Sequence, residues 1–148
     1  DRTKSRGLGD VYKRQLIKCK SLNFKIYVED TDFQGVVYHA NYIKFFERAR
    51  SEFLSDNKIS QSELKKNDQA FVIKSVNIKY IAAAELGDNI YVESEVEKKS
   101  NARMIFNQKV INCDNEKEYA IGVVEVCFIN LVTKKPQKFP DDLLLIFD

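Results

Sequence analysis

Apolar and polar residues alternate with two different periods along this chain, and the change of period separates a helical part from a strand part. Between about His39 and Leu54, apolar residues recur at intervals of three and four, which is typical of a helix with one buried face. This pattern predicts a helix of roughly 16 residues, about 24 Å long. A second, shorter helix is predicted to open at Ser60, because Glu63 follows at the spacing of a capping box.

Alternation with a period of two dominates the remaining sequence. Ahead of the long helix, the segment from Ser21 to Val28 alternates and is predicted to be a half-buried strand. After Asp68 come four long runs rich in β-branched residues, AFVIKSVNIKYIAAA, NIYVESEVEKK, ARMIFNQKVIN and EYAIGVVEVCFINL. Their connections are too short for crossover helices, so neighbouring strands should pair antiparallel. The order predicts an α+β domain in which one long helix packs on a five-stranded antiparallel sheet.

Composition places the chain among single compact soluble domains, since it has 148 residues, 44% of them hydrophobic and 31% charged. Cys19, Cys113 and Cys127 are odd in number and far apart, and the chain has one histidine. These counts favour neither a disulfide framework nor a metal site, and they indicate a reducing, cytoplasmic compartment. No apolar run approaches the roughly 18 residues of a transmembrane segment, so none is expected.

The net charge of +2 is unevenly distributed along the chain. Residues 1–15 carry five basic and two acidic residues, so that residues 16–148 sum to −1. A nearly neutral domain is a poor candidate for binding nucleic acid, which requires clustered cations. The leader 1–15 lacks both an initiating Met and a signal-like apolar stretch. We expect it to be non-native or disordered, with a functional basic arm as the alternative, and the folded domain to occupy 16–148.

Candidate chemistry concentrates between the first strand and the long helix. Glu29, Asp30 and Asp32 precede Gly35 and the only histidine, His39. Carboxylates ahead of a helix are favoured by its dipole, so a capping or turn role is the simplest interpretation. The second interpretation is that one carboxylate is chemically active while the unpaired N–H groups of the helix start polarise a substrate. Gly35 would allow the tight turn between them.

The run DTDFQGVVYHANY from Asp30 to Tyr42, followed by FERAR, resembles the signature of hotdog-fold acyl-CoA thioesterases. The resemblance is to the 4-hydroxybenzoyl-CoA thioesterase type, most closely its bacterial Tol-Pal-associated branch, and it extends over residues 21–147. It implies hydrolysis of a short-chain aliphatic or aromatic acyl-CoA, with coenzyme A entering as part of the substrate. By this resemblance Asp32 is the catalytic acid, either as nucleophile or as general base, and the backbone N–H of His39 is the principal donor to the carbonyl.

Several neighbours of these two residues are candidates for contact with the substrate: Gly35, Val37, Tyr38, Asn41 and Tyr42. Each could instead hold the helix start in place. Asp30 is expected to be structural. Farther along the helix, Glu47 is expected to form a solvated or interface pair with Arg50, although some enzymes of the resembling fold use an acid on the helix.

Coenzyme A carries phosphates, which require cations. Lys98, Lys99 and Arg103, at a turn between two predicted strands, are the best local candidates, although a charged turn is usually just solvated. The chain also departs from its apparent relatives, which often carry a proline and then a basic residue where Ala83 and Glu85 stand here. An acid in this place weakens the case for docking of an acyl carrier protein on the same surface.

Self-association is expected, because one helix cannot cover both faces of the sheet and long edge strands are open to further pairing. The resemblance implies a homodimer, or a homotetramer built from two dimers. Two other functions stay open. One is a non-hydrolytic module that binds acyl-CoA or acyl carrier protein, and the other is a partner protein of the cell envelope. The complete set of Asp32, Gly35 and His39 argues against the first.

Overall fold

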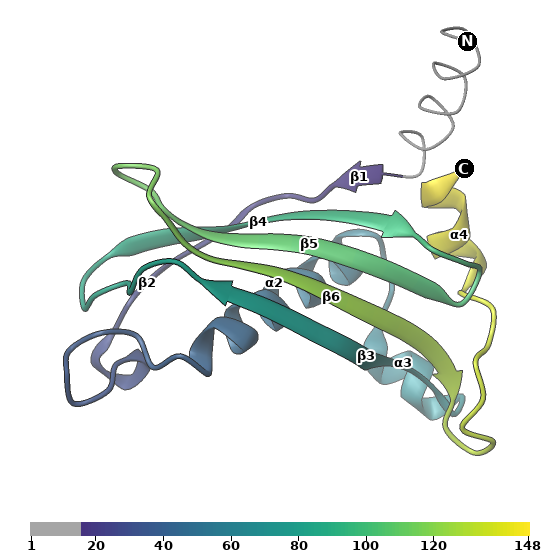
Figure 1. The fold of residues 1–148 in the computed structure, drawn as a ribbon. Helices are drawn as coiled ribbons and strands as arrows, with labels where there is room; N and C mark the ends of the chain where they lie inside the picture. Colours follow the sequence, from purple (N-terminus) through teal and green to yellow (C-terminus); the bar gives the residue numbers. More distant parts are fainter. Residues whose placement is uncertain (1–15) are drawn as a thin grey trace, which may run out of the picture.

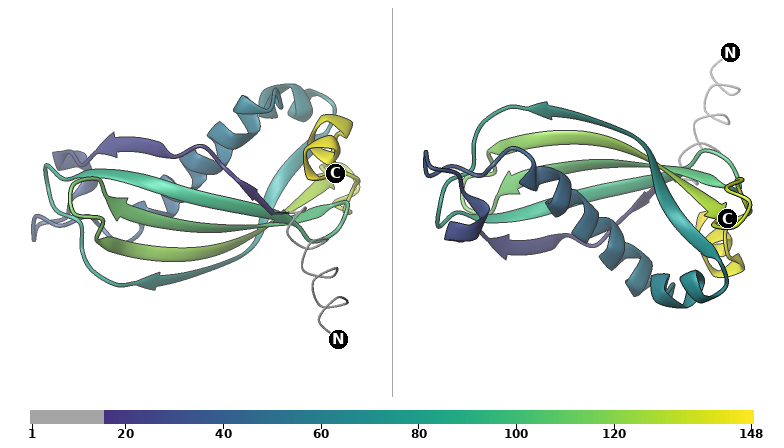
Figure 2. Two further views of the ribbon diagram at one scale, coloured as in Figure 1. Left: turned by 90° about the horizontal axis from the view of Figure 1, so that it is seen from above. Right: turned by 90° about the horizontal axis from the view of Figure 1, so that it is seen from below.

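A computed structural model describes residues 16–148, which form an antiparallel sheet with one long helix lying across it (Figure 1). The helix is α2 (Asn41–Asp56). The sheet contains β1 (Leu16–Lys18), β2 (Leu22–Lys25), β3 (Gln69–Tyr80), β4 (Asn89–Lys98), β5 (Arg103–Asn112) and β6 (Glu118–Asn130). Seen from below, α2 crosses in front of the strands, and from above the strands lie in front of it (Figure 2). The predicted α+β hotdog arrangement is therefore confirmed.

The strand order is β1-β4-β5-β6-β3, and β2 also pairs with β4. The sheet has six strands, one more than predicted, yet it is five strands wide because β1 and β2 succeed one another along β4. All the strand pairs are antiparallel, as the short connections required. β3 pairs with β6 on one side and with no described strand on the other, so it forms an edge of the sheet.

Both predicted helices are present. α2 has the predicted length of 16 residues, and it buries the face that carries most of its aromatic residues. α3 (Gln61–Lys66) begins after Ser60, whose hydroxyl accepts a hydrogen bond from the N–H of Glu63 at 3.2 Å. This is the cap that the spacing of the two residues indicated.

The prediction of a strand through Val28 is wrong. β2 ends at Lys25, and Val28–Asp30 form a short 3-10 helix, η1, in which Val28 is 72% exposed. The side chain of Asp30 accepts the N–H of Tyr27 at 2.9 Å, and the N–H of Asp30 donates to the carbonyl of Tyr27 at 3.0 Å. This reciprocal pair closes a turn that competes with strand pairing. The sequence analysis also missed β1 and the C-terminal helix α4 (Asp141–Phe147).

The core forms two clusters along α2. The first surrounds Tyr42, Phe45, Phe46 and Ala49 in the first half of the helix, and the second surrounds Phe53 and Leu54 in the second half. Gly122 of β6 lies beneath Phe46, and a Cβ at this glycine would come within 2.6 Å of the phenylalanine ring. The absence of a side chain at Gly122 therefore allows the helix to approach the sheet closely.

The leader 1–15 lies outside the described residues. Cys19, Cys113 and Cys127 are all free thiols. Burial and the nearby charge of Glu95 raise the pKa of Cys19 to about 12, which leaves its thiol protonated and unreactive at neutral pH. Within residues 16–148, no helix is long and apolar enough to span a bilayer.

Candidate active site at the start of α2

The loop between η1 and α2 folds back on itself as a narrow hairpin. Thr31 bridges to Val37, the N–H of Asp32 donates to the carbonyl of Val36 at 2.9 Å, and the N–H of Gly35 donates to the carbonyl of Asp32 at 3.0 Å. Gly35 adopts a φ of 80°, in the left-handed region, while no other heavy atom lies within 4 Å of its missing Cβ. Glycine is therefore favoured here by the backbone conformation, and the space beside it is open.

The two carboxylate oxygens of Asp32 differ in their hydrogen bonding. Oδ1 accepts the N–H of Gln34 at 2.9 Å, which is an Asx turn. Oδ2 accepts no hydrogen bond from any residue of the described chain. The turn role that the sequence allowed is thus present, and it leaves one carboxylate oxygen available for chemistry.

Asp30 makes several hydrogen bonds that hold the loop together, which agree with a structural role. In addition to the bond to Tyr27, its backbone carbonyl accepts the side-chain amide of Asn41 at 2.8 Å and the N–H of Tyr38 at 3.0 Å. Asn41 is buried, so its side chain ties the acidic loop to the first turn of α2. Asn41 thereby braces the acidic loop against the helix start.

Two peptide units at the helix start are fixed through their carbonyl oxygens. The carbonyl of Tyr38 accepts the N–H of Asn41 at 2.8 Å, and the carbonyl of His39 accepts the hydroxyl of Tyr80 at 3.1 Å. Because a peptide unit is planar, these bonds also orient the N–H groups of His39 and Ala40. Neither N–H donates a hydrogen bond within residues 16–148. Two oriented donors with no acceptor suit an oxygen on which negative charge develops.

A shallow hollow of about 260 Å³ is lined in part by His39. Its walls are Val37, His39 and Tyr42 on the helix side and residues 80–83 on the sheet side. The hydroxyl of Tyr42 accepts the N–H of Ala84 at 3.0 Å, and burial raises the pKa of this phenol. The structure thus brings three predicted residues, Val37, His39 and Tyr42, to one hollow. The other predicted site residues lie outside its lining: Asp32, Gly35, Tyr38 and Asn41.

Tyr80 was missed by the sequence analysis. Its ring lies 6.2 Å from the imidazole of His39 and its hydroxyl fixes the carbonyl of His39, although 41 residues separate the two in the chain. Tyr38 is exposed, and its ring centre lies 4.7 Å from that of the imidazole, with the two planes tilted by 53°. Nothing in the local sequence around Tyr80 marks it, because it reads as the last aromatic residue of an alternating strand.

The structure does not bring Lys98, Lys99 and Arg103 to this hollow within one chain. β4 begins beside the acidic loop and ends at Lys98, so the turn that follows lies at the opposite end of the sheet (Figure 1). Lys99 and Arg103 pair with Glu125 at 3.3 and 2.9 Å, and Lys98 donates to the side chain of Asn101 at 3.2 Å. Burial alone would raise the pKa of Glu125, but Lys99 and Arg103 lower it below its usual value.

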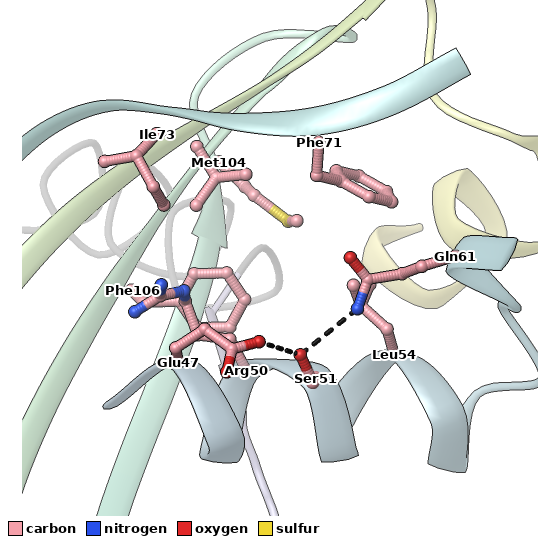
Figure 3. A pocket seen from close by; sticks show the side chains of 10 residues that line it. Glu47, Arg50, Ser51, Leu54, Gln61, Phe71, Ile73, Met104 and Phe106 are labelled. Carbon is pink, nitrogen blue, oxygen red and sulfur yellow. Dashed lines mark hydrogen bonds between the residues drawn. The ribbon is translucent and has the colours of Figure 1, made fainter. Parts of the chain in front are cut away.

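A second pocket, of about 160 Å³, opens between the middle of α2 and β3 (Figure 3). Glu47 was expected to form a solvated or interface pair with Arg50, but no such ion pair occurs within residues 16–148. Glu47 is exposed, and its carboxylate accepts the hydroxyl of Ser51. Arg50 turns inward and donates to the side-chain oxygen of Gln108 at 3.1 Å. Burial lowers the pKa of Arg50, and the negative charge of Glu47 opposes this shift. The four-residue spacing of Glu47 and Ser51 is the one sequence signal that could have revealed the pocket.

Comparisons with known proteins agree with this architecture. A family model described as Thioesterase-like superfamily matches residues 26–147. The acyl-CoA thioesterase YbgC of Haemophilus influenzae is 39% identical over 128 residues, which cover 86% of this chain and 93% of that protein. The acyl-CoA thioester hydrolase YbgC of Escherichia coli O6:H1 is 34% identical over 123 residues, covering 83% and 91% respectively.

Among solved structures, a 1,4-dihydroxy-2-naphthoyl-CoA thioesterase from Synechocystis superposes with a TM-score of 0.83. The match covers 88% of this chain and 95% of that chain at 21% identity. At this identity the likeness bears on the fold alone.

Proposed function

Because the chain belongs to the thioesterase-like superfamily, we propose that it is an acyl-CoA thioester hydrolase whose reaction takes place at the start of α2. The substrate is the thioester of a short-chain aliphatic or aromatic acyl group with coenzyme A. The observation that carries the proposal is the pair of oriented N–H groups of His39 and Ala40, which have no acceptor within residues 16–148 and lie in the same loop as Asp32. A thioester hydrolase needs this combination of a carboxylate and donors for the oxyanion.

In the proposed reaction, the thioester carbonyl lies against the N–H groups of His39 and Ala40. The free oxygen of Asp32 either attacks the carbonyl carbon itself or removes a proton from the attacking water. The carbon–sulfur bond then breaks and the thiolate of coenzyme A leaves and is protonated. Water is consumed and a carboxylic acid is released on both routes. Loss of one oxyanion donor typically lowers the rate about 10² to 10³ fold.

The acyl group is proposed to lie in the hollow beside Val37 and Tyr42, with Gly35, Tyr38 and Asn41 shaping or supporting its entrance. The phosphates of coenzyme A are proposed to contact Lys98, Lys99 and Arg103. Since this turn lies far from the hollow of its own chain, the cations would serve the site of a partner subunit. Acyl carrier protein is a second possible carrier of the acyl group, to be tested beside coenzyme A. A cytoplasmic location is also proposed, with which three free cysteines are consistent.

A homodimer, or a homotetramer of two dimers, is part of the proposal. The free edge of β3 exposes the apolar side chains of Ile73, Val76 and Tyr80 beside unpaired backbone groups. A second copy that pairs with this edge would cover both. Light scattering is expected to give at least a dimer, and a fully active monomer would contradict this part of the proposal.

The decisive test is a thiol-release assay with a panel of acyl-CoA and acyl-carrier-protein substrates. We expect release of coenzyme A from short aliphatic or aromatic thioesters. Binding of these ligands without release of thiol would indicate a non-hydrolytic binding module instead. Failure of both binding and hydrolysis across the panel would favour a partner protein that acts through its surface.

A further inference from the structure

The two N–H groups proposed to bind the oxyanion are held in place by different means. The N–H of His39 belongs to the peptide unit whose carbonyl, that of Tyr38, accepts the backbone N–H of Asn41 at 2.8 Å. The N–H of Ala40 belongs to the next peptide unit, whose carbonyl, that of His39, accepts the hydroxyl of Tyr80 at 3.1 Å. The first support is formed within the helix start itself. The second is a side chain of β3, 41 residues away along the chain.

Three contacts hold Tyr80 in turn. Its backbone pairs with Ala120 of β6 in the antiparallel ladder. Its ring centre lies 5.7 Å from that of Tyr42 and 6.2 Å from that of the His39 imidazole, in both cases edge to face. Tyr42 is only 2% exposed, and its hydroxyl accepts the N–H of Ala84 at 3.0 Å. The hydroxyl that reaches the helix start is therefore attached to a well-supported part of the sheet.

The hydrogen bond from Tyr80 affects both the direction and the strength of the Ala40 N–H. Because the peptide unit is planar, a bond that fixes the His39 carbonyl also fixes the direction of the N–H on the same unit. Hydrogen bonds that follow one another in a chain polarise each other, so a carbonyl that accepts a bond makes its N–H a stronger donor. The chain formed by Tyr80, this peptide unit and a bound oxyanion has that arrangement.

We infer that Tyr80 is a positioning residue for thioester hydrolysis, which aims and strengthens the Ala40 N–H as negative charge develops on the substrate oxygen. The inference rests on the proposed thioesterase function and adds to it a residue of the sheet. Tyr80 is not a catalytic residue in this role, because its hydroxyl donates to the backbone. The bond joins two groups of one chain, so the role does not require a free edge of β3.

The test compares Tyr80→Phe with Tyr91→Phe in the thiol-release assay, on an acyl-CoA that the wild type cleaves. Both variants keep the ring and lose one hydroxyl. Tyr91 is the matched control, because its hydroxyl donates to Glu116 at 2.9 Å. It also alternates with Ile90 and Val92, which belong to the core beneath α2, so it lies on the other face of the sheet.

In Tyr80→Phe the Ala40 N–H is misdirected but not removed. Complete loss of an oxyanion donor lowers the rate about 10² to 10³ fold, so we expect kcat to fall by about 10 to 100 fold. KM should stay within about twofold of wild type, since the bond matters most when charge develops in the transition state. Tyr91→Phe should match the wild type in both constants.

A second measurement reports on the donor itself. Benzoyl-CoA bound to Asp32→Asn is turned over slowly, so the stretching frequency of its thioester carbonyl can be recorded by infrared difference spectroscopy. Stronger donors at the carbonyl oxygen lower this frequency. Combining Tyr80→Phe with Asp32→Asn should therefore raise it, whereas combining Tyr91→Phe with Asp32→Asn should leave it unchanged.

Replacement of Tyr80 by 3-fluorotyrosine provides another variant in case Tyr80→Phe folds or assembles poorly. It keeps the shape and the hydroxyl, and fluorine makes the phenol a stronger donor while it stays protonated. The carbonyl frequency of bound benzoyl-CoA should then fall below that of the enzyme with tyrosine at this position. An unchanged or raised frequency would overturn the inference. Light scattering should give the same assembly for wild type and all variants.

The outcomes separate this inference from the proposed function. If the enzyme cleaves thioesters but Tyr80→Phe keeps the wild-type kcat, the inference is overturned and the thioesterase function stands. A change confined to KM, or a fall in kcat with an unchanged carbonyl frequency, would also overturn it, because the hydroxyl would not act through the Ala40 N–H. If the wild type releases thiol from no thioester of the panel, the proposed function fails and the inference fails with it.

Discussion

The two ends of the sheet use their charged and polar groups in opposite ways. At the end where α2 begins, Asp32 keeps one carboxylate oxygen free, and the N–H groups of His39 and Ala40 have no acceptor in the described chain. At the other end, in the turn between β4 and β5, Lys99 and Arg103 share the carboxylate of Glu125. One end retains hydrogen-bonding capacity, whereas at the other end two of the three predicted cations are already paired with a carboxylate.

The difference indicates where a ligand gains most from binding. An oriented donor without a partner offers a hydrogen bond at little cost, whereas a cation held in an ion pair must first give up that pair. A cluster of charges in a sequence is therefore a weaker indication of a site than groups left unsatisfied by the fold.

The largest effect is expected for Asp32→Asn. The amide oxygen of asparagine can still accept the N–H of Gln34, so the turn persists while the charge is lost. We expect kcat to fall by about 10² to 10⁴ fold in a thiol-release assay, because the nucleophile or base is removed. Thermal unfolding should be nearly unchanged. Glu29 is an exposed acid of the same segment, so Glu29→Gln serves as the control and should retain activity. A fully active Asp32→Asn would remove the contrast between the two ends of the sheet.

Gly35→Ala and Gly87→Ala form a matched pair. Both glycines have positive φ, of 80° and 89°, and neither has a heavy atom within 4 Å of its missing Cβ. Each variant should lose about 1–2 kcal/mol of unfolding free energy through backbone strain alone. Only Gly35→Ala should also lower kcat/KM, by roughly tenfold, because a misplacement near 1 Å in the Asp32 loop impairs catalysis. Denaturant melts and steady-state kinetics measure the two effects, and equal activities in both variants would contradict this role of the loop.

Lys98→Ala examines the other end of the sheet. Lys98 donates to a neutral amide and so keeps its charge for a phosphate, unlike its two neighbours. If this turn contacts coenzyme A, KM for acyl-CoA should rise about twofold to fivefold with kcat unchanged, since an exposed contact of this kind is worth about 1 kcal/mol or less. KM for an acyl-pantetheine thioester, which lacks the nucleotide, should not change. If Lys98→Ala changes KM by the same factor for acyl-CoA and for the acyl-pantetheine thioester, the turn does not contact the nucleotide and is simply solvated.

Glu125→Gln is expected to affect stability and leave turnover unchanged. The pKa of Glu125 is lowered in the folded state, so its carboxylate stabilises the fold above the ordinary pKa of a glutamate, and this contribution is lost as the pH falls through the lowered value. Wild type should therefore melt above the variant at pH 7, and the difference should shrink as the pH falls below the ordinary pKa of a glutamate. A difference in melting temperature that does not depend on pH would contradict the assigned ion pairs.

Much of the fold was readable because its determinants are local. The periodicity of α2, the cap at Ser60 and the four long alternating strands depend on residues a few positions apart. β1 and α4 were missed for the opposite reason, since both are short and are held by long-range contacts such as those of Leu143 and Phe147 with the core. The strand predicted through Val28 failed because a local turn at Asp30 competed with the alternation.

By itself, the sequence determined the fold class, the acidic loop and the identity of the residues around the helix start. Only the tertiary structure decided which of their groups stay free. Tyr80 orients a peptide unit 41 positions away in the chain. Glu125 forms ion pairs with Lys99 and Arg103. Gln108 accepts a hydrogen bond from Arg50, 58 positions away. The physical reason is that a residue's type fixes how many hydrogen bonds it can make, while the partners that use them come from strands distant in the chain.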